Sequence, residues 1–286
     1  MRVVIFGATG MLGHMLTRVL ALDPRYEVFA TVRGTLDDYP QLSGYHRHII
    51  ENVAVTDEAR IGRLLEEIAP RVVVNAAAMR PSGLTPATTI DFVRVNALWP
   101  HQLANLAGPM GIRLCHISSD GVFSGQRGAY REDDRPDPED VYGAAKLVGE
   151  PVGRHVVNLR TSIIGPELNA GAGLLSWFLR QDAAIKGYSQ WLYSGLTTLE
   201  LANIIRDDVL PNSDLQGIYH VAGAPISKFE LLRLLSKYYE HDIPIEEDAS
   251  VTRDRTLDAT RFLNATGYKS PGWPDMISAL RQLGNL

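Results

Sequence analysis

Residues 2–13 read RVVIFGATGMLG, an apolar run that leads into three glycines spaced three residues apart. The run Arg2-Val3-Val4-Ile5-Phe6 is rich in β-branched side chains and ends at glycine, which predicts a short buried strand. The apolar residues that follow at helical spacing are Leu12, Leu16, Val19 and Leu20. The opening of the chain is therefore expected to form a strand, a glycine loop and a helix.

The glycine loop has the chemistry of a site for the pyrophosphate of a dinucleotide. Gly7 permits a tight turn, Gly10 lets the backbone approach the ligand, and Gly13 lets the helix pack closely on the sheet. The helix N-terminus adds free N–H groups and the positive end of its dipole. Incidental glycines in an ordinary strand–loop–helix are the alternative interpretation. The loop residues expected to contact the cofactor are Gly7, Thr9, Gly10, Met11, Leu12 and Gly13.

The rest of the first half alternates between strand and helix patterns. Further strands are predicted at 26–32, 48–50, 71–75, 112–118 and 156–160, and helices at 61–68, 92–106 and 142–150. Such alternation indicates a parallel sheet with helices on both faces. Right-handed crossovers then make an α/β fold with a doubly wound, Rossmann-like sheet the simplest topology.

The alternation weakens after residue 160, where the glycine-rich stretch 165–173 predicts a crossing into a smaller lobe. We therefore expect a dinucleotide-binding Rossmann domain over 1–162 and a mainly substrate-binding C-terminal lobe over 163–286. A strand predicted at 217–221 could return to the first sheet. Helices are predicted in this half at 198–209, 228–239 and 274–283.

The composition narrows the class of protein. The 286 residues are 45% hydrophobic and 21% charged, which suits a globular fold with a sizeable core. The net charge of −5 argues against nucleic acid or an anionic membrane as the main partner and leaves a small-molecule substrate. The lone Cys115 cannot form an internal disulfide, and no Cys/His cluster has metal-ligand spacing. With no signal-peptide pattern and no membrane-length apolar run, a reducing, cytoplasmic location is expected.

The residues that follow two of the predicted strands bear on the cofactor. Arg33 follows the second strand, where an acidic side chain would receive a ribose 2′-hydroxyl and an arginine suits a 2′-phosphate. NADP(H) is therefore favoured over NAD(H), with a solvated surface arginine as the alternative. Asn75, Ala76 and Ala77 end the fourth strand, and their small side chains would leave room for the cofactor. Tight core packing is the alternative for these three.

A catalytic set is predicted beyond the fifth strand. Tyr142 and Lys146 lie at i and i+4, on one face of a helix. A neighbouring ammonium would lower the pKa of the phenol and fit it for acid–base work, and the same lysine could hydrogen-bond the nicotinamide ribose. Ser119 stands at the end of the strand, where doubly wound sheets bind ligands. A surface pair and an ordinary serine turn are the alternatives.

These motifs together resemble the extended short-chain dehydrogenases/reductases, and within them the dTDP-4-dehydrorhamnose reductase group of sugar-nucleotide reductases. The stretch Ser118–Gly125 is similar to the family's Ser-Thr-Asp-Tyr-Val-Phe-x-Gly segment, and Gly128–Glu132 and Tyr142–Glu150 also match. The resemblance covers residues 1–160 well and is looser beyond, where Thr256–Asp258 is similar to a late Ser-Leu-Asp segment. One departure is Gly121, which stands where the family has tyrosine.

The resemblance implies NADPH-dependent reduction of a nucleotide-linked 4-keto-6-deoxysugar, with hydride delivered to C4. Ser119 would take the hydroxyl role, Tyr142 would be the proton donor and Lys146 its helper. Asp120 and Arg255 are the expected substrate contacts, and Arg255 is preferred over Arg160 and Arg253 as a partner for the diphosphate. The alternatives are a sugar-nucleotide 4-epimerase that retains NAD and a non-catalytic NADP-binding regulatory subunit.

Two further expectations concern packing and assembly. His116, His220 and Trp177 are predicted to be packing residues, since each lies inside a predicted strand or helix. In relatives, the helices near 87–107 and 142–151 often pack against their copies, so a homodimer is expected.

Overall fold

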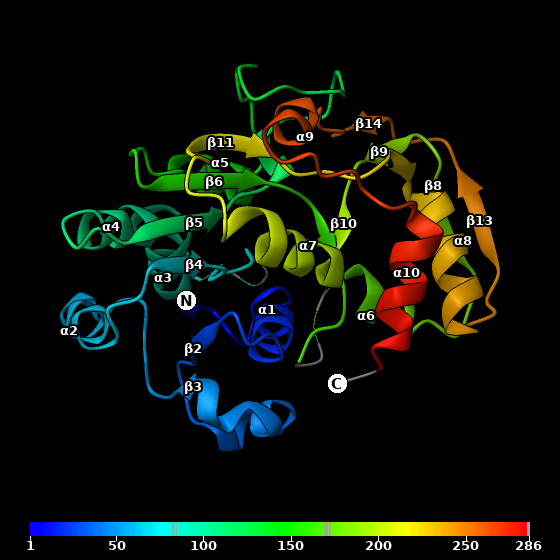
Figure 1. Cartoon of the computed structure of the whole chain (residues 1–286). Helices are drawn as coiled ribbons and strands as arrows, with labels where there is room; N and C mark the ends of the chain where they lie inside the picture. The colour runs from blue at the N-terminus through cyan, green and yellow to red at the C-terminus, as the bar shows by residue number, and fades with distance from the viewer. Residues whose placement is uncertain (82, 84, 169–170, 172, 285–286) are drawn as a thin grey trace.

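A seven-stranded sheet runs through the centre of the molecule in the order β11-β6-β5-β4-β1-β2-β3 (Figure 1). The computed structural model describes residues 1–81, 83, 85–168, 171 and 173–284. All neighbouring strands in this sheet are parallel. The strands are β1 Arg2–Phe6, β2 Glu27–Thr31, β3 Ile49–Ile50, β4 Val72–Asn75, β5 Arg113–Ile117, β6 Val156–Arg160 and β11 Gly217–His220. The predicted doubly wound parallel sheet is confirmed, and its strand order reverses between β1 and β4.

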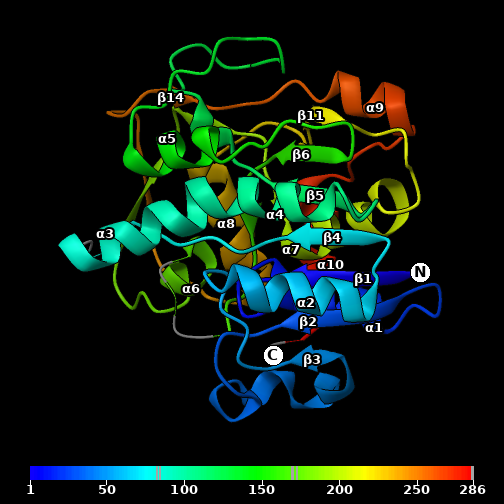
Figure 2. The same cartoon turned by 90° about the vertical axis from the view of Figure 1, so that its left-hand side faces the viewer.

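Helices cover both faces of the sheet, which explains why its strands read as unbroken apolar runs. Val4 and Phe6 of β1 pack with the side that carries α2 Glu58–Ile68 and α4 Trp99–Ala107 (Figure 2). Val3 and Ile5 alternate to the other side, which carries α1 Gly13–Ala21 and α7 Thr198–Ile204. The two sides of one short strand thus enter two separate hydrophobic clusters.

The chain beyond residue 162 adds small sheets and four more helices. The strand pairs are β7 Ile163–Ile164 with β10 Leu196–Thr197, and β8 Ile185–Tyr188 with β13 Ile245–Asp248. A three-stranded sheet joins β12 Ile226–Ser227, β9 Trp191–Tyr193 and β14 Arg253–Asp254. The helices are α6 Leu174–Phe178, α8 Lys228–Tyr239, α9 Thr260–Thr266 and α10 Trp273–Gln282.

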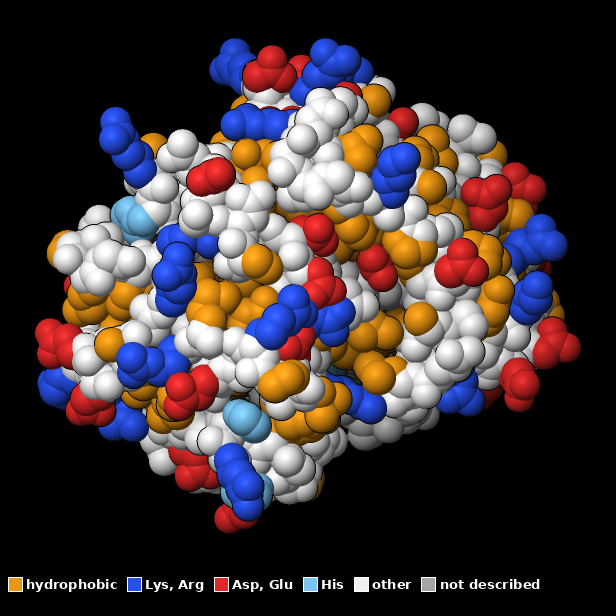
Figure 3. All heavy atoms as spheres, viewed as in Figure 1, with side chains coloured by type: hydrophobic (Ala, Val, Ile, Leu, Met, Phe, Trp, Pro, Cys, Tyr) orange, Lys and Arg blue, Asp and Glu red, His pale blue; other side chains and the backbone are white. Residues whose placement is uncertain are grey.

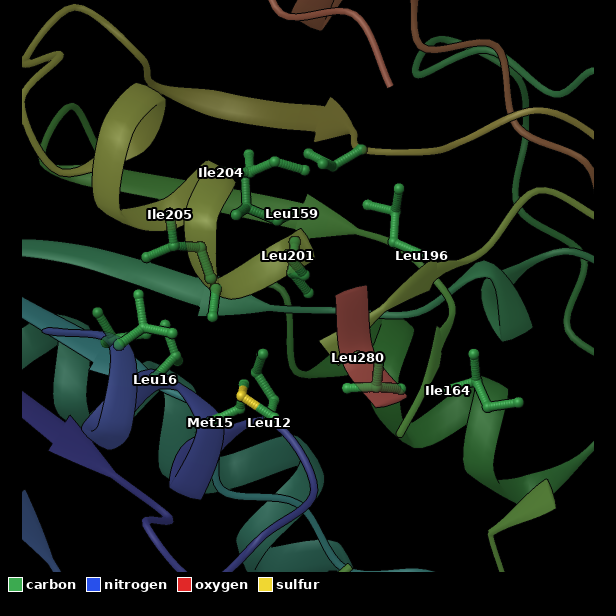
Figure 4. Close-up of a cluster of buried hydrophobic side chains, with 14 of the residues drawn as sticks. Leu12, Met15, Leu16, Leu159, Ile164, Leu196, Leu201, Ile204, Ile205 and Leu280 are labelled. Carbon is green, nitrogen blue, oxygen red and sulfur yellow. The ribbon is translucent and has the colours of Figure 1, made fainter. Parts of the chain in front are cut away.

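One hydrophobic cluster joins this second part to the sheet. Figure 4 shows Leu12 and Met15 at the start of α1 near Leu280 of α10, with Leu201 of α7 between them and the strand residue Leu159. The second part also returns to the sheet through α7 and through β11, which pairs with β6. The division into domains at residue 162 stays a prediction, and residues 169, 170 and 172 of the predicted crossing lie outside the described residues.

The helix expected over 92–106 is three consecutive segments: α3 Pro86–Val93, a π-helical turn at Arg94–Leu98, and α4. Pro100 has no N–H to donate to the Asn96 carbonyl, and its ring crowds that carbonyl, so the turn widens there. Gly149 after α5 Val141–Val148 lies against this carbonyl, since a Cβ at 149 would stand 2.0 Å from Asn96 O. The end of α5 therefore packs directly against the backbone of the widened turn.

The surface carries mixed charge. On the face shown in Figure 3, basic and acidic side chains are interspersed with apolar ones. None of the helices in the described ranges has both the length and the apolar character that a bilayer crossing requires.

Candidate functional site

A cavity of about 760 Å³ opens at the carboxyl edge of the sheet, next to the point where the strand order reverses. This is the place where open α/β sheets bind ligands. Its walls come from the glycine loop, the ends of β4 and β5, the helix α5 and the second part of the chain. The predicted site residues in these walls are Thr9, Gly10, Met11, Leu12, Ala76, Ala77, Ser119, Asp120, Tyr142, Lys146 and Arg255.

The three loop glycines differ in what surrounds them. Gly7 has φ +88°, and a Cβ there would stand 2.6 Å from the Ala77 backbone nitrogen. A Cβ on Gly13 would stand 1.9 Å from the Gly7 carbonyl oxygen. Gly10 has more room, with its nearest neighbour, Gly7 O, at 3.3 Å, and it lines the cavity. Gly7 and Gly13 therefore shape the loop, whereas Gly10 leaves open the space that a pyrophosphate would fill.

Tyr142 is the second residue of α5, and Lys146 follows it one helix turn later. The carboxylate of Asp140 caps this helix by accepting a hydrogen bond from Gly143 N at 2.7 Å. Lys146 is buried and its ammonium donates to the carbonyl oxygen of Ile117 at 2.7 Å. Tyr142 and Lys146 both line the cavity, as their spacing on one helix face requires.

The expected lowering of the tyrosine pKa does not hold in this structure. Burial raises the pKa of Tyr142 to about 12, with a further increase from the carboxylate of Asp120. Burial also lowers the pKa of Lys146 to about 8, opposed by Glu150. Because the lysine is directed at the end of β5, the spacing on the helix does not by itself stabilise the phenolate. The phenol is thus protonated at neutral pH, the state of a proton donor.

Ser119 and Asp120 form the turn that ends β5. The Ser119 hydroxyl accepts from Gly121 N at 3.0 Å and donates to Asp120 Oδ1 at 3.2 Å. Burial raises the pKa of Asp120, while the guanidinium of Arg255 lowers it. At Gly121 the turn meets α5 backbone to backbone, because a Cβ on Gly143 would stand 2.0 Å from Gly121 O.

Arg255 enters the cavity from just beyond β14. Its Nη2 lies 3.6 Å from Asp140 Oδ2, and its side chain is 13% exposed. Among the described residues, its Nε and Nη2 are buried without a hydrogen-bond partner. A guanidinium with unused donors beside a cavity is suited to an anionic oxygen.

The other two arginines considered from the sequence lie elsewhere. Arg160 is 2% exposed and donates through Nε and Nη2 to the Glu150 carboxylate, both at 2.8 Å. Arg253 pairs with Glu139 at 2.6 Å and lies over the Trp191 ring. Neither lines the cavity, so the sequence-based preference for Arg255 agrees with its position.

Arg33 lies apart from the cavity walls. It follows β2 as an exposed side chain and is absent from the described lining residues. Three more of the predicted cofactor residues do not line the cavity: Gly7, Gly13 and Asn75. Gly7 and Gly13 lie against neighbouring backbone, and Asn75 is fully buried. The cofactor role of Arg33 stays a prediction.

Sequence reasoning missed three groups at the site. Arg80 and Glu167 both line the cavity and form an ion pair across it at 2.7 Å. They are 87 positions apart in the sequence, so no local sequence motif contains both. His116 was expected only to pack, yet its Nε2 lies 3.4 Å from Lys146 Nζ. The sequence did offer one signal for His116. The fourth and fifth strands were predicted to be parallel neighbours, which places His116 beside Asn75 at the same end of the sheet.

In the part of the chain that the structure describes, His, Cys, Asp and Glu side chains form no group of three suited to a metal.

Comparison with known proteins gives relatives that match over nearly the whole chain and others that match over about half of it. A dTDP-4-dehydrorhamnose reductase of Aggregatibacter actinomycetemcomitans is 27% identical over 306 residues, covering 98% of both chains. The methionine adenosyltransferase 2 subunit beta of Xenopus laevis is 31% identical over 151 residues, which are 52% of this chain and 41% of that one.

Solved structures share the fold. A dTDP-4-dehydrorhamnose reductase from Bacillus anthracis, solved in complex with NADP, superposes with a TM-score of 0.80 at 22% identity, over 99% of each chain. The family described as RmlD substrate binding domain matches residues 1–182. The resemblance inferred from the motifs is confirmed: the chain belongs to this RmlD family of extended short-chain dehydrogenases/reductases.

Proposed function

We propose that the chain is an NADPH-dependent reductase of a nucleotide-linked 4-keto-6-deoxysugar. The observation that carries the proposal is the cavity itself, which brings Ser119, Tyr142 and Lys146 to the same space as the glycine loop and Arg255. The full-length similarity to a dTDP-4-dehydrorhamnose reductase supports the choice of substrate class.

Tyr142, Ser119 and Lys146 would each have a different role in the reduction. Bound NADPH would supply the hydride for the C4 carbonyl. Tyr142 would donate a proton to the carbonyl oxygen, because reduction places negative charge there and the raised pKa of the phenol keeps its proton in place. The Ser119 hydroxyl would hydrogen-bond the same oxygen, after exchanging its present bond to Asp120. Lys146 would hold the nicotinamide ribose.

The substrate would extend toward the second part of the chain. Arg255 has buried donors free to bind a diphosphate oxygen. Asp120 accepts a hydrogen bond from Ser119, and the charge of Arg255 acts on it. Gly121 replaces a side chain that the family carries at this turn. It therefore leaves the sugar contact there to backbone or to neighbouring groups.

The cofactor site fits a dinucleotide by shape. The space over Gly10 is bounded by backbone, and a larger side chain would fill it. The preference for NADP(H) over NAD(H) rests on Arg33, and the NADP complex of the Bacillus anthracis relative favours the same choice. A cytoplasmic location remains part of the proposal.

The deciding experiment is an NADPH oxidation assay across a panel of nucleotide-linked 4-keto sugars. Turnover with exchangeable NADPH is expected. Purified protein that carries tightly held NAD(H) and interconverts C4 epimers would favour the 4-epimerase. Binding of NADP(H) without turnover of any panel member would favour the regulatory-subunit alternative, which the similarity to the methionine adenosyltransferase subunit keeps open.

We also propose a homodimer through α3 and α5. Apolar side chains exposed on these helices and the turn between α3 and α4 are Ile90, Val93, Leu98, Val141 and Val148, each about half exposed or more. Exposed apolar groups gathered on adjacent elements are typical of an interface. Light scattering at micromolar concentration should give the mass of a dimer, and Val148→Asp should shift it toward the monomer. A monomeric wild-type protein would refute this assembly.

A further inference from the structure

Four buried polar side chains form a connected row behind the cavity. Trp99 Nε1 donates to Asn75 Oδ1 at 3.2 Å, and Asn75 Nδ2 lies 3.1 Å from His116 Nδ1. The row ends at Lys146, whose Nζ is 3.4 Å from His116 Nε2. None of the four is more than 2% exposed. Because buried polar groups are costly unless hydrogen-bonded, the direction of each bond in this row matters.

The direction is set at the Trp99 end. The indole N–H can only donate, and so can the backbone N–H of Ala77, which lies 3.3 Å from the same Asn75 Oδ1. This atom is therefore the amide oxygen, and the amide NH₂ group faces His116. His116 Nδ1 must accept, so the neutral ring carries its proton on Nε2, toward Lys146. Burial lowers the pKa of His116 well below its usual value, and the Lys146 charge lowers it further, which keeps the ring neutral.

We propose that His116 is a positioning residue that holds Lys146 through its Nε2–H and favours the neutral amine over the ammonium. An N–H at this place can bond to the lone pair of an amine, which an ammonium lacks. The lysine also donates to Ile117 O at 2.7 Å, so a neutral amine satisfies one donor and one acceptor at once. The other titratable groups around the pair are His101 of α4, Tyr142 of α5, and Glu150, which follows the end of α5. Of these, Glu150 favours the ammonium.

The role rests on the proposed function, in which Lys146 holds the nicotinamide ribose, a contact that the charged ammonium makes more strongly than the neutral amine. Activity should then fall as pH rises through the pKa of Lys146. Because His116 favours the neutral amine, it lowers the pKa of Lys146, and the activity is then lost at a lower pH than it would be without His116. Removing His116 should move the limit upward.

The test measures the titration of Lys146 directly. The chain has five lysines, so lysine labelled with ¹³C at Cε gives a spectrum simple enough to follow by NMR, with the Lys146→Arg variant assigning the signal. His116→Phe removes both ring nitrogens and should raise the midpoint of Lys146 by about 0.5 to 1 pH unit, the size of one ordinary hydrogen bond. The alkaline limb of the kcat profile should move by the same amount. His116→Gln, whose amide can place an N–H near Nε2, should bring the midpoint back toward wild type.

Two further variants keep the result decisive. His220→Phe removes another fully buried histidine, outside the cavity walls, and should leave the midpoint unchanged. Asn75→Asp cannot donate to Nδ1, so His116 would turn a lone pair toward Lys146 and the midpoint should rise. The Asn75→Asp/His116→Phe double variant measures the effect of the added charge alone. If His116→Phe does not fold, His116→Leu takes its place, because leucine is smaller and also lacks both ring nitrogens. A raised midpoint then supports the proposal, and an unchanged midpoint overturns it.

An unchanged midpoint in His116→Phe overturns the proposal, as does an equal shift in His220→Phe. The titration needs no substrate. A wild-type protein that reduces no sugar nucleotide would therefore reject the proposed function, while the NMR midpoint would still decide the role of His116.

Discussion

Two walls of the cavity differ in composition: backbone atoms form most of the cofactor wall, and side chains form the wall from the second part of the chain. The cofactor wall is mostly backbone: Gly7 and Gly13 bring the loop, α1 and the end of β4 closer than any side chain allows. The wall from the second part of the chain is made by single side chains such as Arg255, which reach the cavity from the loop after a two-residue strand. A backbone wall tolerates no added atom, whereas a side-chain wall can lose one group and keep its shape. The two walls should therefore respond to substitution in different ways.

The largest effect is expected where the backbone is closest. Gly13→Ala places a Cβ 1.9 Å from Gly7 O, so α1 must move away from the loop. We expect the free energy of unfolding to fall by about 3 kcal/mol or more and cofactor binding to be lost. Urea unfolding and calorimetric titration with NADPH measure the two effects.

Gly10→Ala is the matched control within the same loop. Its Cβ would lie 3.3 Å from Gly7 O, a contact that a small shift relieves, and its φ lies outside the left-handed region. Stability should change by less than about 1 kcal/mol, while NADPH binding weakens because the methyl group enters the cavity. Equal loss of stability in both variants would mean that the close approach at Gly13 is not what shapes the loop.

Tyr142→Phe should give the next largest effect, on rate and not on stability. The change removes the phenolic hydroxyl and keeps the ring, so turnover should fall by about 100-fold or more, as for loss of a general acid, with NADPH still bound. Lys146→Met should reduce both turnover and cofactor affinity. Single-turnover NADPH oxidation with a competent sugar nucleotide separates the steps, and a near wild-type rate in Tyr142→Phe would leave the tyrosine a structural role.

The contrast between the walls also explains what the sequence could predict. The sheet was predictable because each central strand is a continuous apolar run, and the helices that cover it repeat every three to four residues. The strands of the second part are two to four residues long, and β9 pairs with β12 and β14, far away in sequence. No local period marks such strands.

The site follows the same division. Ser119, Tyr142 and Lys146 were predicted because helix and strand spacing places them together, and all three line the cavity. Arg80, Glu167 and the contact of His116 with Lys146 depend on tertiary packing and left no mark in local spacing. The pKa of Tyr142 was misjudged for a related reason. Burial by distant segments raises this pKa, and the ammonium of Lys146 is directed at Ile117 O.

Arg255→Ala tests the side-chain wall and should have a moderate effect. Loss of a charge-assisted contact to a diphosphate oxygen is worth about 1.5–3 kcal/mol, which is about 10- to 100-fold in KM for the sugar nucleotide. Turnover and the affinity for NADPH should change little. Arg253→Ala is the control, because this arginine lies nearby but is paired with Glu139 outside the cavity. A KM change as large in Arg253→Ala would move the diphosphate contact away from Arg255.

Arg33→Ala should have the smallest effect, because Arg33 is an exposed residue on the cofactor side. An arginine in water gives up favourable hydration to bind a phosphate, so its net contribution is smaller than that of the partly buried Arg255. We expect KM for NADPH to rise about 5- to 10-fold, consistent with one exposed charge-assisted contact, and KM for NADH to stay the same, since NADH lacks the 2′-phosphate. Initial rates with each cofactor at saturating sugar nucleotide make the comparison, and high salt should shrink the difference for an exposed contact. An equal rise for both cofactors would place Arg33 outside the ribose site and leave the choice between NADPH and NADH to the backbone wall.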